Sequence, residues 1–161
     1  MEFRKKLDFS EGLKNFTFQS NVAYIHSKVE NKKGGFNVDR PMQGQSPYVL
    51  NFGLLYDLEK AGFNATLLYN QIGHRLAYVG NIDDGFPDIY EAGRPLLDLQ
   101  LTKKIIENKA EIRLSVSDML NQVRYFYQNA DDKNSFQKNE DAYRFTRKFG
   151  TTFGISFNYS L

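Results

Sequence analysis

The chain has 161 residues, enough for one domain, and it carries 21 basic and 19 acidic residues for a net charge of +2. The basic residues are scattered, whereas a nucleic-acid-binding protein usually has a basic stripe or patch, so we expect no nucleic-acid partner. There is no cysteine, which excludes disulfides, thiol chemistry and cysteine-based zinc sites. The longest purely apolar run is about four residues, far short of the roughly 20 that a transmembrane helix needs.

Alternation of apolar and polar residues predicts strands, because successive side chains on a strand point to opposite faces. The first three segments with this pattern are Glu2–Phe9, Leu13–Val29 and Tyr48–Leu58. Each has one predicted apolar face, formed in order by Phe3, Leu7 and Phe9; by Phe16, Phe18, Val22 and Tyr24; and by Leu50, Phe52, Leu54, Tyr56 and Leu58.

The next three predicted strands are Gly62–Gly73, Pro95–Ile105 and Lys109–Leu120. Their apolar faces are formed by Phe63, Ala65, Leu67 and Tyr69; by Leu97, Leu99, Leu101 and Ile105; and by Ala110, Ile112, Leu114 and Val116. The opposite faces are polar and include Asn70, Gln100, Glu111 and Arg113.

The last strand, over residues 149–161, has the clearest alternation. Phe149, Phe153, Ile155, Phe157, Tyr159 and Leu161 share one face, and small or polar residues form the other. Thirteen residues is long for a globular strand, and a transmembrane β-strand needs only about 9–11. The low mean hydropathy of −0.54 would normally indicate a soluble protein, but it does not exclude a membrane barrel, because half of each strand faces a polar interior.

The predicted connections alternate in length. Short ones lie at Ser10–Gly12, Glu59–Ala61 and Glu107–Asn108, and long polar ones at Glu30–Pro47, His74–Arg94 and Asn121–Ala142. Short periplasmic turns and long extracellular loops are typical of outer-membrane barrels. We therefore expect an all-β fold, an antiparallel up-and-down meander of about seven long strands that is part of a larger transmembrane β-barrel.

One hairpin can be tested by its register. A turn at Glu107-Asn108 pairs Leu101 with Leu114 and Leu99 with Val116 on the apolar side. On the polar side it places Lys104 opposite Glu111, an opposite-charge pair that favours antiparallel pairing. Both faces therefore agree with the same register.

No motif in the sequence indicates catalysis, so we expect no enzyme activity, no catalytic or metal-binding residue and no cofactor. The two histidines, His26 and His74, are far apart in sequence, and we interpret them as ordinary strand-end residues. Asp83-Asp84 and Asp131-Asp132 do not have the spacing of a calcium loop. Five tyrosines near predicted strand ends fit either an aromatic girdle at the membrane interfaces or plain strand propensity: Tyr24, Tyr48, Tyr56, Tyr69 and Tyr159.

Several short motifs occur in an order that resembles the C-terminal barrel region of TonB-dependent outer-membrane receptors. They are Arg40-Pro-Met-Gln-Gly-Gln-Ser-Pro-Tyr48, Asn51-Phe-Gly-Leu-Leu-Tyr56, Leu68-Tyr-Asn70 with Gly73 and Arg75, Asp88-Ile-Tyr-Glu91 with Arg94, Leu97-Asp98 with Gln100, Leu120-Asn121, and Gly154-Ile-Ser-Phe-Asn-Tyr-Ser160. Each motif is weak alone, and the resemblance rests on their order across nearly the whole chain.

The resemblance implies a barrel of about 22 strands whose lumen holds a plug domain. Such a receptor lies in the cell outer membrane, where it binds an extracellular iron chelate, cobalamin or glycan and takes it up through a TonB complex that pulls on the plug. The implied partners are the outer-membrane lipid, the plug, the TonB complex through it, and the barrel-assembly machinery. Phe157, Tyr159 and Leu161 match the barrel-assembly signal, although the family usually ends in Phe or Trp rather than Leu.

The sequence departs from that family in three ways: it has no signal peptide, no plug and only about a third of the barrel strands. We therefore expect a fragment or a processed form of a larger receptor, in which Asn70, Gln100, Glu111 and Arg113 face the lumen. The three long loops are the expected source of ligand contacts, and no single ligand-binding residue can be assigned.

Two alternatives remain open. The chain could be a complete small outer-membrane barrel with a structural or adhesive role, with an eighth strand at Arg124–Asn129. It could also be a soluble all-β carbohydrate-binding module, in which case the outward faces of the strands should be polar rather than apolar.

Overall fold

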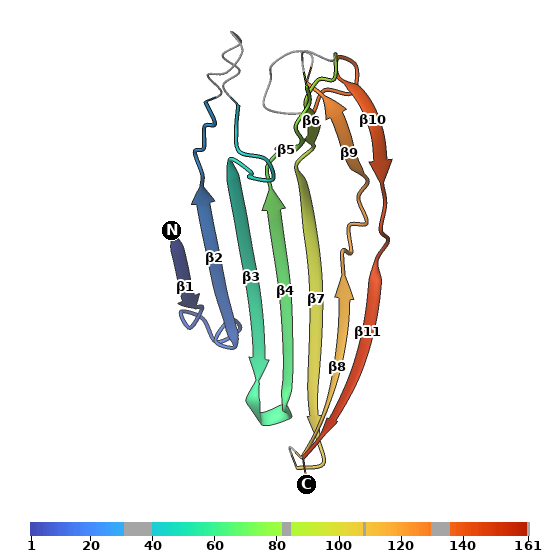
Figure 1. The fold of residues 1–161 in the computed structure, drawn as a ribbon. Helices are drawn as coiled ribbons and strands as arrows, with labels where there is room; N and C mark the ends of the chain where they lie inside the picture. The colour runs from blue at the N-terminus through green and yellow to red at the C-terminus, as the bar shows by residue number, and fades with distance from the viewer. Residues whose placement is uncertain (31–39, 82–84, 108, 130–135, 161) are drawn as a thin grey trace.

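The computed structural model describes residues 1–30, 40–81, 85–107, 109–129 and 136–160. Over these residues the chain is all-β, and seven strands form its main sheet (Figure 1). These strands are β1 (Glu2–Lys6), β2 (Phe16–Tyr24), β3 (Tyr48–Leu58), β4 (Phe63–Ile72), β7 (Arg94–Ile105), β8 (Ala110–Ser117) and β11 (Thr152–Tyr159). A short 3₁₀ turn, η1 (Glu59–Ala61), joins β3 to β4.

The main sheet has the order β1-β2-β3-β4-β7-β8-β11, and every neighbouring pair is antiparallel. The predicted antiparallel up-and-down meander of seven strands is therefore confirmed. Between the described residues of β1 and β11 there is no pairing, so the sheet is open and has two free edges. Barrel closure, the finer part of the prediction, is not seen.

Four further strands extend the meander at one end: β5 (Arg75–Tyr78), β6 (Ile89–Glu91), β9 (Arg124–Gln128) and β10 (Ala142–Arg147). They form a second sheet in the order β10-β9-β6-β5. The strands of this upper sheet continue the courses of β11, β8, β7 and β4 respectively (Figure 1). The two sheets are thus successive stretches of the same hairpins.

The predictions that His74–Arg94 and Asn121–Ala142 are long loops are wrong in part, because β5, β6 and β9 lie inside them. Their alternation was hidden because each strand is interrupted by irregular residues before it resumes. Arg124–Asn129, proposed above as an eighth strand, does form β9, but it extends β8 instead of adding a strand to the main sheet.

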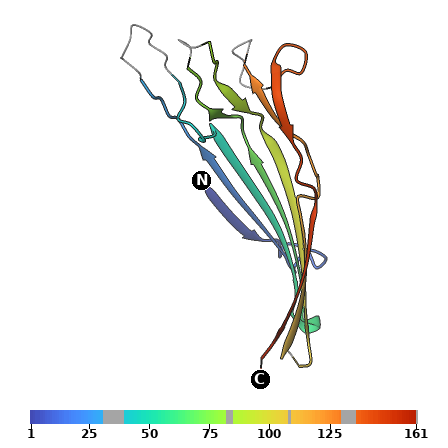
Figure 2. The same ribbon diagram turned by 45° about the vertical axis from the view of Figure 1, so that its right-hand side comes forward.

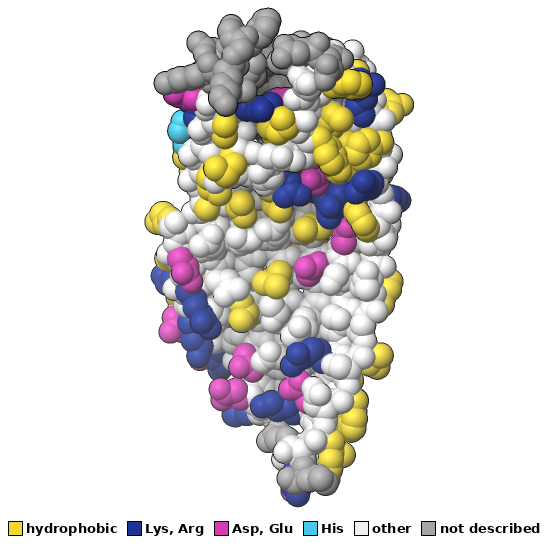
Figure 3. All heavy atoms as spheres, in the orientation of Figure 1, with side chains coloured by type: hydrophobic (Ala, Val, Ile, Leu, Met, Phe, Trp, Pro, Cys, Tyr) yellow, Lys and Arg dark blue, Asp and Glu magenta, His cyan; other side chains and the backbone are white. Residues whose placement is uncertain are grey.

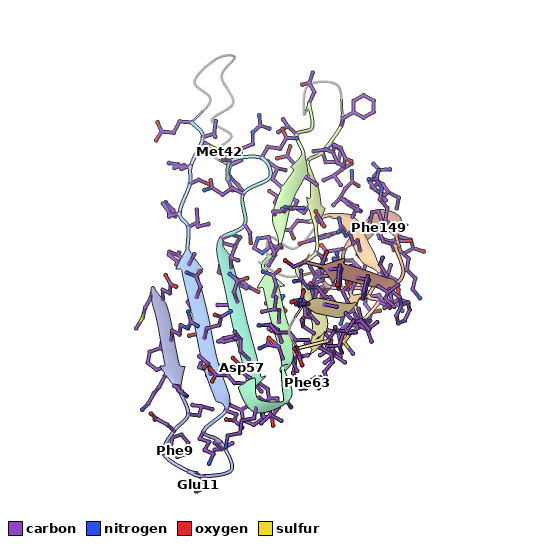
Figure 4. The ribbon with its side chains drawn as sticks, turned by 90° about the horizontal axis from the view of Figure 1, so that it is seen from below. Phe9, Glu11, Met42, Asp57, Phe63 and Phe149 are labelled. Atoms are coloured by element: carbon purple, nitrogen blue, oxygen red, sulfur yellow. The ribbon has the colours of Figure 1, made fainter. Side chains whose placement is uncertain are left out.

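Other predicted segments were also too long, including Lys109–Leu120, which forms a strand only over Ala110–Ser117. The first strand ends at Lys6, and Phe9 is 72% exposed in the following turn instead of lying on a strand face with Phe3 (Figure 4). The second occupies Phe16–Tyr24 rather than Leu13–Val29. The last begins at Thr152, because Gly150 has a φ of 84° that separates β11 from β10; Leu161 lies outside the described residues.

The predicted register of the β7–β8 hairpin is confirmed. Leu101 pairs with Leu114, Leu99 with Val116, and Lys104 with Glu111. At the turn the Lys109 amide donates to the Ile106 carbonyl at 2.9 Å. Asn108, one of the two predicted turn residues, lies outside the described residues.

The main sheet has one apolar and one polar face. A single row on the apolar face runs through six strands as Phe18, Leu54, Leu67, Leu99, Val116 and Phe153. The neighbouring row on the polar face includes Gln19, Gly53, Leu68 and Asp98. No second layer of described residues covers the apolar face, and Phe153 and Ile155 are 76% and 78% exposed.

The two ends of the sheet differ. The short connections lie at the end where β11 finishes. Phe9 and Glu11 belong to the first of them, Asp57 and Phe63 lie in β3 and β4 beside the second, and Met42 belongs to the opposite end (Figure 4). The longer connections all lie at the end of the upper sheet, and the strands diverge toward it (Figure 2). The predicted segregation of short turns and long connections is therefore present among the described residues.

The predicted tyrosine girdle fits the structure in part. Tyr24 and Tyr48 pair with each other at the long-connection end, and Tyr159 lies at the other. Tyr56 contacts Phe16 near the short-turn end, with ring centroids 4.8 Å apart. Tyr69 instead lies inside the sheet, opposite Leu97 and beside Phe52, so its assignment to a strand end is wrong.

We expect Gly93→Ala to destabilise the fold by about 1–3 kcal/mol, because a Cβ there would lie 2.8 Å from the Ile72 carbonyl oxygen and 3.1 Å from the Gly73 backbone. Denaturant unfolding followed by circular dichroism measures the change. Gly12→Ala is the matched control, since a Cβ at Gly12 meets nothing within 4 Å. Equal stability of both variants would contradict the close approach of β4 and β7.

Candidate functional site

Charged side chains gather where the main sheet meets the upper sheet. We call this group the junction cluster: Arg75, Glu91, Arg94, Asp118 and Arg124. Arg75 donates to Glu91 Oε2 through Nε at 2.9 Å and Nη2 at 2.7 Å. Arg124 Nη1 lies 3.8 Å from Glu91 Oε1, and Arg94 Nη1 donates to Asp118 Oδ2 at 3.0 Å. Glu91 thus holds two arginines from neighbouring strands.

The junction cluster lies on the polar face, and Gly73 and Gly93 place it there. If side chains alternated between the two faces without a break from Leu97, which lies on the apolar face, Glu91 would also lie on the apolar face. The β4–β7 register continues unchanged into β5–β6, yet Glu91 and Arg75 lie beside Arg94, on the polar side. The alternation therefore changes face at these two glycines, which lie between the strands. Figure 3 shows basic and acidic side chains gathered on the upper part of this side of the molecule.

Several polar atoms of this region are buried. The side chains of Arg94 and Asp118 are 10% and 15% exposed. Burial lowers the pKa of the Arg124 guanidinium, and the positive charges of Arg94 and Arg75 lower it further, against the opposing effect of Glu91 and Asp118. Arg124 Nε, Asp118 Oδ1 and Asn121 Oδ1 are buried without a hydrogen-bond partner. A cavity of about 60 Å³, whose lining includes Glu91, Arg94 and Arg124, has room for water but not for a nutrient-sized ligand.

An aromatic group lies beyond the junction cluster in the upper sheet. Phe126 stacks on Phe145 with ring centroids 4.4 Å apart, and Tyr78 lies 6.3 Å from both. Arg147 lies over the Phe126 and Phe145 rings at 5.6 and 5.3 Å. The sequence prediction missed this group because Tyr78 and Phe126 fell in segments interpreted as loops, and the stretch with Phe145 and Arg147 was assigned to no element.

A larger cavity lies at the long-connection end, between the β2–β3 connection and β5. We call this space, of about 480 Å³, the upper cavity; its lining includes Tyr24, His26, Gln45, Tyr48 and His74. The connection is held against the free edge of β5 by two hydrogen bonds. The Gly44 amide donates to the Leu76 carbonyl at 2.8 Å, and Gln43 Nε2 donates to the Ala77 carbonyl at 2.9 Å.

The two histidines, which we interpreted as unrelated, both line the upper cavity. The His74 ring lies 6.4 Å from that of Tyr90, and burial lowers the pKa of His74, so its imidazole is neutral near pH 7. Their sequence separation of 48 positions gave no signal of this proximity. Among the described residues, no group of three His, Cys, Asp or Glu side chains is placed to hold a metal ion.

The residues predicted to face a lumen do share the polar face. Asn70 Nδ2 donates to Asn51 Oδ1 at 2.6 Å, and Arg113 forms an ion pair of 2.8 Å with Glu111. Gln100 pairs with Thr66 and Ser115 on the same face. They are spread over three strands, so they form a polar wall rather than one site.

Of the predicted assembly-signal residues, Phe157 and Tyr159 lie on the apolar face of β11 and are 60% and 52% exposed. Leu161, the third, lies outside the described residues. So do Asp83-Asp84, Asp131-Asp132 and residues 31–39 of the first predicted ligand-binding loop, which leaves these parts of the prediction without a structural test.

Comparison with known proteins gives no relative: no family model, no curated protein and no solved structure matches the chain. Within the part of the chain that the structure describes, there is no helix long and apolar enough to span a membrane.

We expect Glu91→Gln to lower the free energy of unfolding by about 1–3 kcal/mol, because it removes the negative charge that Arg75 and Arg124 share and replaces one of the two carboxylate oxygens by a donor in a partly buried cluster. Glu111→Gln is the matched control. Its partner Arg113 is 44% exposed, so the same substitution should cost only about 0–1 kcal/mol. Chemical denaturation of the two variants side by side makes the comparison, and a larger loss at Glu111 would contradict the role given to Glu91.

Proposed function

We propose that this chain forms part of the wall of a transmembrane β-barrel in the outer membrane, in a TonB-dependent receptor for nutrient uptake. The observation that carries the proposal is the uncovered apolar face of a single-layer antiparallel meander. Large exposed apolar surfaces mark contact with another protein or with lipid. A face that is apolar across six neighbouring strands fits the lipid-facing band of a barrel.

The asymmetry of the connections supports the same orientation. Short turns lie at one end and longer connections at the other, as in outer-membrane barrels with short periplasmic turns. In this orientation the upper sheet, the junction cluster and the upper cavity lie on the extracellular side. The polar wall around Asn51, Asn70 and Arg113 faces the lumen, where it meets water or a plug.

Two free edges favour a larger barrel over a complete small one. The edge strands β1 and β11 each pair on one side only, and lipid leaves no water to satisfy the free backbone groups. Further strands of the same receptor would pair with both edges. The ligand class follows from the resemblance alone, as an iron chelate, a cobalamin or a glycan admitted when the TonB complex acts on the plug.

The soluble carbohydrate-binding alternative is less well supported. A soluble sandwich covers the apolar face of each sheet with another layer. No such layer exists among the described residues, and Leu114 and Ile155 are 45% and 78% exposed on that face.

Orientation can be tested by labelling single cysteines, since the chain contains none of its own. We expect a membrane-impermeant maleimide to label Phe86→Cys, at the long-connection end, on intact cells. It should label Glu11→Cys, at the short-turn end, only after the cells are broken, although both side chains are well exposed. Labelling of both on intact cells, or recovery of the protein in a soluble fraction, would reject the spanning barrel.

Charge substitutions on the two faces should differ in effect. Leu114 lies on the apolar face opposite Leu101 and Ile155, and the adjacent Ser115 lies on the polar face opposite Gln100 and Gly154. Leu114→Arg should cost about 2–4 kcal/mol near the membrane midplane and lower the amount of folded receptor. Ser115→Arg should cost much less, unless a plug packs tightly there. Quantifying both variants in isolated outer membranes tests this, and equal losses would count against the face assignment.

A further inference from the structure

The upper cavity opens next to the apolar face of the main sheet. Tyr24 and Tyr48 line it, and they pair at the ends of β2 and β3. The same face continues below them through the paired residues Val22 and Leu50. A Cβ added to Gly73 would lie 2.7 Å from a carbon of the Tyr48 ring. The ring therefore also lies on the apolar side of β4. The apolar surface therefore leads to the upper cavity, whose lining combines aromatic rings with polar side chains.

The polar groups of the upper cavity include an acceptor that lacks a donor. Gln45 Oε1 is buried and has no hydrogen-bond partner. Its neighbour Ser46, itself buried, uses its hydroxyl to donate to the Tyr48 carbonyl at 2.9 Å. Because Gln45 Oε1 is buried, an O–H or N–H group of a ligand in the cavity would reach it after a rotation of the Gln45 side chain, and would then supply the missing hydrogen bond.

The charges around the cavity do not favour an anion. Arg75 is the cationic side chain among the described lining residues that would attract a phosphate, and both its Nε and Nη2 donate to Glu91. Burial lowers the pKa of His74, so this residue contributes a neutral imidazole. Neutral donors and acceptors beside aromatic rings suit an uncharged group with many hydroxyls, whose ring carbons can pack on Tyr24 and Tyr48.

We propose that the upper cavity binds the headgroup of a glycolipid, an amphiphile with an uncharged, hydroxyl-rich polar end, whose alkyl chain lies along Val22 and Leu50. The site is separate from the nutrient path, because it opens on the outer face of the sheet while the polar wall faces inward. This proposal rests on the membrane placement given under the proposed function. It adds a lipid partner that the nutrient-uptake role does not require.

The test uses the full-length protein purified in an amine-oxide detergent, which has no sugar. Native mass spectrometry then counts bound octyl glucoside, octyl phosphocholine and free glucose at matched concentrations. We expect octyl glucoside to be retained preferentially. Equal retention of octyl phosphocholine would overturn the headgroup assignment, and equal retention of free glucose would assign the cavity to a soluble sugar instead.

Two neighbouring glutamines give matched variants. Gln45→Leu removes the unpartnered acceptor and should weaken retention of octyl glucoside about fivefold. Gln43→Leu loses only its bond to the Ala77 carbonyl and lies outside the cavity lining, so retention should stay within about twofold. Equal losses in both variants would show that the loop position, rather than Gln45, governs retention, and would overturn the proposed contact.

The outcome is separable from that of the proposed function. A protein that passes the cysteine-labelling test but shows no preference for octyl glucoside refutes the lipid site alone. A protein that fails the labelling test refutes the membrane placement, whatever it binds.

Discussion

The backbone pairing of one continuous meander is the interaction on which the rest of the structure depends. Among the described residues only four hydrophobic side chains are buried: Leu76, Ala110, Phe126 and Tyr127. So small a core cannot by itself offset the conformational entropy of ordering a chain of this length. Order in the main sheet therefore comes from the ladders that each strand makes with its neighbours, and burial of the apolar face must come from the surroundings. Under our proposal that burial is supplied by lipid.

The same pairing determines where chemistry can be placed. Because the β4–β7 register is kept through the irregular residues, Arg75 and Glu91 remain opposite each other in β5 and β6. The glycines between the sheets then turn this pair toward Arg94 on the polar face. A side chain at Gly93 would collide with the Ile72 carbonyl. The absence of a side chain at this position therefore allows both the close approach of the two backbones and the position of the junction cluster.

Two polar features at the extracellular end of the proposed barrel differ in character. The junction cluster is densely charged, and each of its carboxylates already holds an arginine, which suits a structural brace between the sheets. The upper cavity is larger and lined mainly by neutral groups. Arg75 lines both the upper cavity and the small cavity of the junction cluster, so the two features adjoin at β5. Under our proposal a lipid would enter the upper cavity past Tyr24 and Tyr48, on the apolar face of the same hairpins.

Local alternation was enough to predict the seven main strands, their antiparallel order, the register of Leu101 against Leu114 and the two chemically distinct faces. These features depend on the period-two direction of side chains and on short turns, which neighbouring residues specify. Several motifs used for the family resemblance, including Arg75, Glu91, Arg94 and Asn121, fall in or beside the junction cluster, yet their sequence gave no sign that they meet. That meeting needs pairing between distant strands and a change of face at two glycines. Likewise, only the folding of residues 40–47 against β5 brings His26 and His74 to one cavity, because proximity across 48 positions is a property of the sheet and not of any local pattern.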